Sequence, residues 1–410
     1  MYKIIDCKFL YCPKNGLLEN QSLIIKNNNI FDFGPLEKFK KLQYKRIDLK
    51  NSLIMPGFVN AHIHLELNWV NKKLKKFNNF PGWLEQIIYL KKMMLKKNLI
   101  LKSVKDSIKY SIQSGVTTVG QISSYKGIDI PIIKKSNIRC GYFFEIANSN
   151  INNFQYDLEK INSILKENEL INLMIFPHSI YSLNTSSWEK IKKNAKKFNI
   201  DIGTHLSESY DEIKFIQNKK NRFDSKIFKL ISTQPNVKRK NNITPLGYLK
   251  NLKILANKPT LVHMNNINNN DKKIIMNKNL PITICPRSNI FLKEKMPDLK
   301  FYLEYENTAL GTDGLSSNKD LDFLNEIKFL YKECKKLKIS NLEEKILNIA
   351  TLGGAKNLKL YDKIGTLEKN KFADIIGFKI ENKNPLKTIF KHGRKNLKFL
   401  MINGKIKRLR

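Results

Sequence analysis

The sequence contains no run of about 18 apolar residues, so it has no segment of the kind that spans a bilayer. Its first residues, MYKIIDCKFLYCPKNG, alternate like a strand and lack the apolar region and cleavage site of a signal peptide. The five cysteines are scattered and form no Cys-X-X-Cys pair, which argues against a disulfide framework. We therefore expect a cytoplasmic protein with reduced thiols and no membrane partner.

Arginine and acidic side chains are also scarce. Lys and Arg together number 74 against 36 Asp and Glu, which gives a formal charge of +38, but only eight of these cations are arginines. The lysines are spread over the whole chain, and Asn and Ile are abundant, as in proteins from AT-rich genomes. A nucleic-acid binder more often shows an Arg-rich patch with interleaved aromatics. We expect no specific nucleic-acid partner; a basic nucleic-acid-binding protein remains the remote alternative, and its binding would be salt-sensitive and would survive chelation.

What the chain does contain is enough apolar material for a large core. Hydrophobic residues make up 41% of the 410 residues, with 23 Phe and 15 Tyr. This length predicts one large domain with an accessory domain, or two or three small ones.

Both ends of the chain read as short strands separated by turns. The first fifty residues alternate around Asn- and Gly-rich turns, and the last fifty do the same, with a hairpin signal at Asn403-Gly404. This pattern predicts one small β domain assembled from residues 1–52 and 362–410.

The middle, residues 53–361, alternates helix and strand. Helical patterns cover 82–97 and 100–114, and Gly115 ends the second of them. Later strands are predicted at 116–119, 141–146, 173–176, 201–204, 260–262, 282–284 and 308–310. Eight strands alternating with helices predict an α/β fold, a (β/α)₈ TIM barrel. The Lys/Asn-rich stretch 217–243 has weak periodicity and is expected to be a loop or an insertion.

Chemistry in such a barrel gathers at the C-terminal ends of the strands. The first barrel strand ends in His62-Ile63-His64, whose two imidazoles point to one side of an extended chain. Five of the six histidines follow predicted strands, and only His392 does not. The later strand ends are followed by His178, His205, His263, Arg287 and Asp313. The pattern indicates a metal site on the rim of the barrel.

The motifs resemble the amidohydrolase superfamily, in the branch of nucleobase and nucleoside deaminases and chlorohydrolases. The matching segments are PGFVNAHIHLE, SGVTTV, PHSIYS, THLSES, VHMNNI, CPRSN, GTDGLSSN, ATLGGAKNL and IGTLEKNKFADIIGF. They occur in family order from about residue 50 to 405. The resemblance implies a (β/α)₈ barrel with a β-sandwich built from both termini.

The resemblance also implies roles for individual residues. It makes His62, His64, His205 and Asp313 the ligands of one divalent metal. It makes Glu208 the proton-shuttling glutamate, His263 the residue that orients substrate or water, and Asp313 the acceptor of the water proton. Binuclear members carry a carboxylated lysine at the end of strand four, where this chain has His178. A single ion is therefore expected, with Zn²⁺ favoured and Fe²⁺ the alternative.

Such a metal lowers the pKa of water from 15.7 toward about 7. Hydroxide would add to an amidine-like carbon such as C6 of adenine, while Glu208 acts as the acid toward the adjacent ring nitrogen. Glu208 could instead be a first-turn helix residue.

Within the branch, the chain is most similar to aminodeoxyfutalosine deaminases of the futalosine route to menaquinone, whose substrate is an adenine nucleoside bearing a benzoate. His178 is then expected to contact substrate, and Arg287 to bind the carboxylate or to form a structural salt bridge. Methylthioadenosine deaminases hold the ribose with a glutamate about nine residues after a tryptophan. In this chain the residue nine positions after Trp83 is Lys92, so that ribose contact is absent or comes from elsewhere. Glu85 is the candidate to replace it, although Glu85 also fits a solvated position on a helix. The alternatives are deamination of S-adenosylhomocysteine, methylthioadenosine or guanine, and chlorohydrolase chemistry. A homodimer is one option for the assembly.

Overall fold

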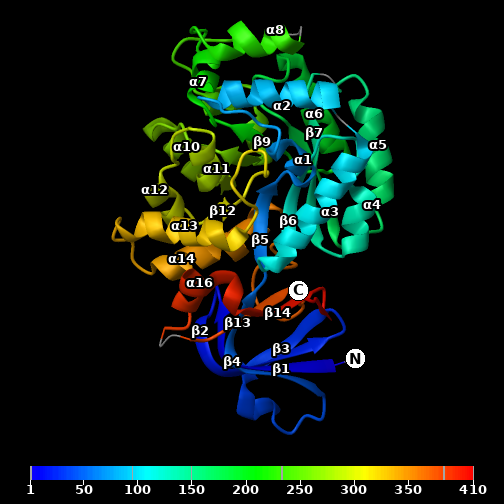
Figure 1. The fold of residues 1–410 in the computed structure, drawn as a ribbon, viewed down its shortest axis with the longest axis vertical. Coiled ribbons are helices and arrows are strands. Elements are labelled where there is room, and N and C mark those ends of the chain that lie inside the picture. Colours follow the sequence, from blue (N-terminus) through cyan, green and yellow to red (C-terminus); the bar gives the residue numbers. More distant parts are fainter. Residues whose placement is uncertain (1, 95, 149, 232–233, 382–383, 410) are drawn as a thin grey trace.

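The computed structural model describes residues 2–94, 96–148, 150–231, 234–381 and 384–409. It has two parts, a ring of parallel strands surrounded by helices and a smaller sheet that holds both termini (Figure 1). The eight strands of the ring are β5 (Phe58–Ile63), β6 (Val116–Ser123), β7 (Arg139–Ile146), β8 (Ile171–Pro177), β9 (Gly203–Leu206), β10 (Thr260–His263), β11 (Ile282–Ile284) and β12 (Thr308–Leu310). The (β/α)₈ barrel is confirmed.

The barrel consists of two four-stranded parallel sheets, β5-β6-β7-β8 and β12-β11-β10-β9. A parallel bridge between Ile175 and Ile202 joins β8 to β9. On the other side, the backbone N–H of Asp313 donates to the carbonyl of His62 at 3.1 Å and ties the end of β12 to β5. This second seam therefore brings two of the predicted metal ligands together through the backbone itself.

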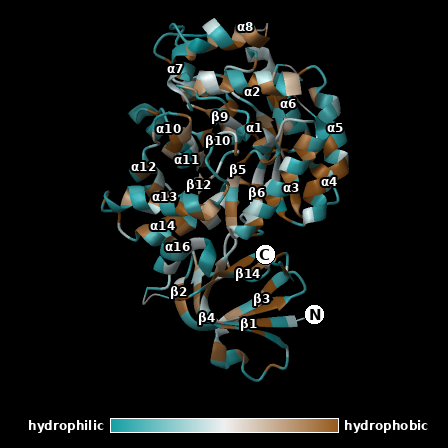
Figure 2. Cartoon of the chain, in the orientation of Figure 1, coloured by the Kyte–Doolittle hydropathy of each residue, from teal (hydrophilic) through white to brown (hydrophobic). Residues whose placement is uncertain are grey.

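Helices surround the ring because their apolar faces pack on the strands, while their polar faces meet water. Figure 2 shows hydrophobic residues along β5 and β6 and hydrophilic residues on much of the outer helix surface. The helices are α1 (Asn68–Asn71), α2 (Phe80–Met94), α3 (Lys97–Gln113), α4 (Ile130–Ser136), α5 (Phe154–Leu165), α6 (Thr185–Phe198), α7 (Tyr210–Ile216), α8 (Phe228–Ile231), α9 (Pro245–Asn251), α10 (Asn269–Lys278), α11 (Pro286–Phe291), α12 (Leu299–Glu304), α13 (Phe323–Lys335), α14 (Leu342–Asn348), α15 (Gly354–Asn357) and α16 (Lys387–His392). Within the described ranges, no helix combines the length and apolarity needed to span a membrane.

The smaller part is composite, as predicted. Its seven strands form one sheet in the order β15-β14-β13-β4-β1-β2-β3. They are β1 (Tyr2–Cys12), β2 (Gly16–Lys26), β3 (Asn29–Pro35), β4 (Lys45–Pro56), β13 (Ile375–Lys379), β14 (Leu397–Ile402) and β15 (Lys405–Ile406). It lies at the end of the barrel opposite α2, α7 and α8 (Figure 1).

The chain passes from the small sheet into the barrel at Gly57. Residues 53–56 still pair with β1 and β13, so the apolar run before the HxH motif belongs to the small sheet. A Cβ at Gly57 would lie 2.2 Å from Thr117 Oγ1, so only glycine fits where the chain crosses β6.

The stretch 217–243 is more ordered than its composition indicates. A π-helical turn, Phe223–Ile227, leads directly into α8. Phe223, Ile227 and Phe228 are buried, and residues 232–233 lie outside the described ranges. The expected loop is thus in part a helical segment, and its apolar side chains pack over the same end of the barrel as α2.

Candidate metal centre and active site

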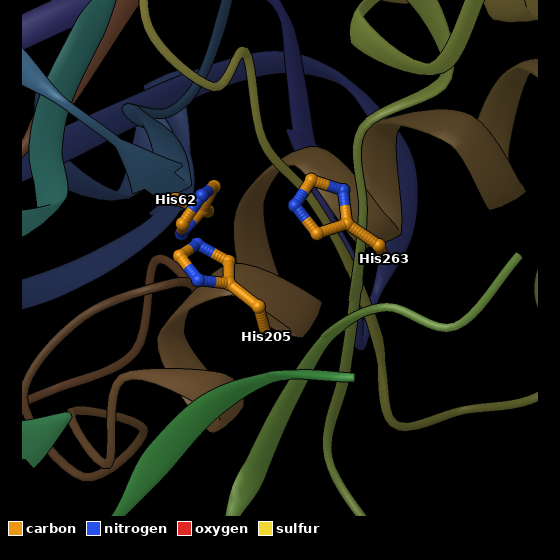
Figure 3. A group of neighbouring side chains, drawn as sticks. All are labelled: His62, His205 and His263. Atoms are coloured by element: carbon orange, nitrogen blue, oxygen red, sulfur yellow. The ribbon is translucent and has the colours of Figure 1, made fainter. Parts of the chain in front are cut away.

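Three imidazoles from three strands converge on one space. His62 comes from β5, His205 from β9 and His263 from β10, and Figure 3 shows their rings grouped around a common centre. The ring centroid of His62 lies 5.1 Å from that of His64 and 5.1 Å from that of His205. All are buried, so their convergence is a property of the barrel interior and not of a mobile surface.

Asp313 completes the group from the end of β12. Its Oδ1 lies 3.5 Å from His62 Nε2 and 3.6 Å from His64 Nε2. Zinc ligands at about 2.0–2.1 Å in a tetrahedron stand about 3.3 Å apart, so these separations suit one ion. Asp313 adopts a left-handed backbone with φ of 59°, a strained conformation that turns its carboxylate toward the histidines.

The donor set fits a divalent metal by two further tests. Three overlapping groups place all their ligand atoms within 4.8 Å: His62 with His205 and His263; His62 with His64 and Asp313; and Glu208 with His263 and Asp313. Within the described residues, both ring nitrogens of His62 are buried without a hydrogen-bond partner. Burial also lowers the pKa of His64 to about 4, which keeps its imidazole neutral and able to coordinate.

A second layer of hydrogen bonds orients these ligands. The carbonyl oxygen of His178 lies 3.0 Å from His205 Nδ1, which leaves Nε2 of His205 facing the centre. Ser288 donates to Asp313 Oδ2 at 2.7 Å, and the N–H of Gly314 donates to Oδ1 at 2.8 Å. The CPRSN motif therefore contributes a serine that holds the aspartate.

Glu208 lies beside the metal group, between β9 and α7. Its Oε1 is 3.4 Å from His263 Nε2, and its backbone N–H donates to Glu212 Oε2 at 2.9 Å. Burial raises the pKa of Glu208 well above its ordinary value, and the charges of Asp313 and Glu212 add to the shift. A raised pKa favours the protonated carboxyl group, which is the form that can act as an acid.

One cavity of about 530 Å³ connects these groups to a largely apolar outer wall. His64, His205, Glu208, His263 and Asp313 lie at its inner end. The outer wall comes from α2 and from the helical segment 223–231 and includes Phe80, Trp83, Leu84, Ile87, Ile88, Ile227, Phe228 and Ile231. The site thus combines a polar reaction centre with an apolar compartment.

His178 lies where the sequence places a substrate contact. It lines the cavity at the end of β8, and its Nδ1 is 3.0 Å from Ser179 Oγ. Its Nε2 faces Glu145 Oε1 at 3.9 Å. No lysine occupies this strand end, in keeping with a site for a single ion.

Arg287 and Glu85 are placed elsewhere. Arg287 donates to Asp320 Oδ2 at 2.6 Å and to Glu326 Oε1 at 3.3 Å, and it is absent from the residues that line the described cavity. Of its two expected roles, the structural salt bridge is the one that the geometry supports. Glu85 is 3.9 Å from Lys226 on the outer side of α2, with 44% of its side chain exposed, which fits the solvated helix position.

Sequence reasoning missed two charged residues of the cavity, Lys91 and Glu145. Glu145 follows the same rule as the histidines, because it stands at the C-terminal end of β7. It belongs to no motif, and only its strand-end position could have indicated it. Lys91 reaches the cavity from α2, and its neighbour Lys92 is exposed.

Comparison with known proteins agrees with this architecture. The solved structure of Helicobacter pylori aminofutalosine deaminase with methylthio-coformycin superposes with a TM-score of 0.86 at 24% identity, covering 99% of this chain and 100% of that one. An adenosine deaminase from Xanthomonas campestris with bound zinc gives 0.85 at 20% identity, covering 99% and 92%. At these identities, both likenesses establish the fold.

Sequence relatives lie at a similar distance. The 5-methylthioadenosine/S-adenosylhomocysteine deaminase of Clostridium tetani is 26% identical over 369 residues, 86% of this chain and 80% of the relative. The 5'-deoxyadenosine deaminase of Methanothrix thermoacetophila is 26% identical over 320 residues, 77% and 71%. The model of the amidohydrolase family matches residues 53–407. The chain therefore belongs to the amidohydrolase family and is a hydrolase that acts on carbon–nitrogen bonds.

Proposed function

We propose that the protein is a metal-dependent deaminase of an adenine nucleoside, with 6-aminodeoxyfutalosine as its substrate and futalosine and ammonia as its products. This would place it in the futalosine route to menaquinone. The observation that carries the proposal is one cavity, in which Glu208 and the His/Asp group face an outer wall of apolar side chains. An adenine at the inner end would leave the benzoate-bearing 5′ substituent against that wall.

His62, His64, His205 and Asp313 would hold the ion, which when bound lowers the pKa of water. Asp313 accepts a proton as the water oxygen adds to C6 of the adenine. Glu208 gives its proton to N1, and His263, 3.4 Å from Glu208, orients the attacking group. The proton on Asp313 passes to the amino group, which leaves as ammonia. The hydroxyl proton on C6 returns to Glu208, so the product carries C6=O and N1–H.

Deamination of methylthioadenosine or S-adenosylhomocysteine is the second candidate. It is favoured by the Clostridium tetani relative of that name, which aligns with 86% of the chain. The apolar wall would also accept a methylthio group.

A panel of substrates separates them. Ammonia release is measured from 6-aminodeoxyfutalosine, methylthioadenosine, S-adenosylhomocysteine, adenosine and guanine, and chloride release is measured from a chlorotriazine. The value of kcat/KM is expected to be highest for 6-aminodeoxyfutalosine. A higher kcat/KM for methylthioadenosine would identify methylthioadenosine as the substrate and would leave the proposed deamination reaction unchanged. Turnover of guanine or the chlorotriazine alone would contradict the proposal.

The wall itself is tested with Ile88→Ala. Ile88 lines the outer cavity from α2, and its truncation is expected to lower kcat/KM for aminodeoxyfutalosine about tenfold, because apolar contact with the appendage is lost. Adenosine lacks the appendage and should be affected little. Ile164→Ala, at an exposed site on α5, is the control. Equal losses on both substrates would show that the appendage does not lie against this wall.

A further inference from the structure

Glu145 is a buried carboxylate of the cavity that the proposed chemistry does not use. It stands at the end of β7, is 8% exposed, and lines the cavity next to His178. His178 Nε2 lies 3.9 Å from Glu145 Oε1, which is too far for a hydrogen bond. A carboxylate offers about four acceptor positions. Among the described residues, Ser124 lies beside this carboxylate, but its hydroxyl donates to Glu66 Oε1, so Glu145 retains acceptor capacity toward the cavity.

The surroundings keep Glu145 charged. Burial acts to raise the pKa of Glu145, but His178 first and the Lys91 ammonium second outweigh burial and hold the pKa below its ordinary value. Lys91 reaches the same wall from α2, and its Nζ lies 3.4 Å from Ser124 Oγ. An ionised carboxylate can only accept hydrogen bonds. It therefore repels an anionic part of a ligand and suits neighbouring hydroxyl groups.

The remaining acids do not compete for this role. The described residues that line the cavity include three carboxylates, Glu145, Glu208 and Asp313. Glu208 and Asp313 face the metal group, where they are needed for proton transfer and for ligation. The helix α2 supplies no carboxylate to the lining, because Glu85 points to Lys226 on the outside.

We infer that Glu145 binds the ribose of the substrate, accepting hydrogen bonds from the 2′ and 3′ hydroxyls with its two carboxylate oxygens. A cis diol presents two O–H donors side by side, which matches a carboxylate whose free oxygens face the cavity. Lys91 and His178 act on Glu145 through their electrostatic effect on its pKa. The inference rests on the proposed function and adds its sugar specificity: the enzyme is selective for ribonucleosides over deoxyribonucleosides.

The test compares adenosine, 2′-deoxyadenosine and 3′-deoxyadenosine as substrates of the metal-loaded enzyme. The wild type is expected to prefer adenosine by on the order of 10- to 100-fold over each deoxy form, as for a hydrogen bond to a charged group. In Glu145→Gln the preference should fall to a few-fold, mainly through lost turnover of adenosine. Metal content and Tm of the variant verify that the centre and the fold are intact. Glu189→Gln, on the exposed face of α6, is the matched control and should keep the preference.

Binding gives a second readout. Titration of adenosine and 2′-deoxyadenosine into the metal-loaded Glu208→Gln protein should show the same preference, and adding Glu145→Gln should remove it. An equal loss of kcat/KM on all three nucleosides in Glu145→Gln would overturn the inference. So would the finding that Glu85→Gln, and not Glu145→Gln, removes the preference for adenosine over its deoxy forms. If the wild type deaminates none of the purine panel, the proposed function fails; if it deaminates adenosine and Glu145→Gln discriminates as before, only the ribose assignment fails.

Discussion

Replacing Glu208 with glutamine is expected to reduce kcat by a factor of 10² or more while the metal stays bound. Glutamine keeps the size and the contact with His263 but has no proton to give to N1 of the adenine. The wild-type rate should also decrease as the pH rises through the elevated pKa of Glu208, because the required proton is then lost. This alkaline limb should be absent from the residual activity of the variant.

The measurement is kcat against pH for both proteins, together with metal content by mass spectrometry. Glu304→Gln, which removes an exposed carboxylate paired with Lys345, is the control and should behave as the wild type. Near-normal turnover by a metal-loaded Glu208→Gln enzyme would remove this residue from the mechanism.

Replacing Arg287 with methionine is expected to destabilise the fold by on the order of 3 kcal/mol. The guanidinium binds Asp320 and the fully buried Glu326, and Glu326 in turn accepts from Asn318 in the segment that follows Asp313. Methionine would leave both carboxyl groups without this cation. Activity should then decline equally on aminodeoxyfutalosine and on adenosine, because Arg287 acts through the fold and not on the benzoate.

The deficit should widen with pH. Burial raises the pKa of Glu326 from 4.5 to about 8, even though Arg287 opposes the shift. Protonated Glu326 therefore contributes to the free energy of unfolding. This contribution is complete below pH 4.5 and is lost as the pH rises through about 8. Without Arg287 this pKa rises further, and the loss continues to higher pH. Unfolding curves at pH 6 and pH 9 measure how the difference in stability between variant and wild type changes. Arg394→Met, which removes a partly exposed ion pair with Asp322, is the control. A selective loss of the benzoate substrate would instead make Arg287 its carboxylate contact.

The barrel and the metal group could be predicted because each depends on local pattern. Parallel strands end at one rim, so a histidine or aspartate after a strand is placed by the strand alone, as His205, His263 and Asp313 are. The HxH motif needs only an extended backbone to bring His62 and His64 together. The ligand atoms from the different strands come within 4.8 Å of one another because the barrel closes, and the eight predicted strands already indicated that closure.

The pairing of Arg287, the outer cavity wall and the position of Glu145 depend on contacts between segments that are distant in the sequence, and no local sequence pattern reveals such contacts. Arg287 meets carboxylates 33 and 39 positions later, so its motif position gave no sign that it is already paired. The outer wall depends on Ile227 and Phe228, whose helical turn is obscured by Lys and Asn in the surrounding sequence. Glu145 is a single acid in an apolar strand, and only its place beside His178 makes it a candidate.

The central claim is that the His/Asp group holds one divalent ion that is required for deamination of aminodeoxyfutalosine. The most direct measurement is metal content per chain alongside ammonia release from that nucleoside, before chelation, after chelation and after stepwise return of Zn²⁺. We predict about one ion per chain, no ammonia release from the stripped protein, and recovery in proportion to the ion restored. Full ammonia release by the metal-free protein, or a fully loaded protein that releases none, would contradict the account.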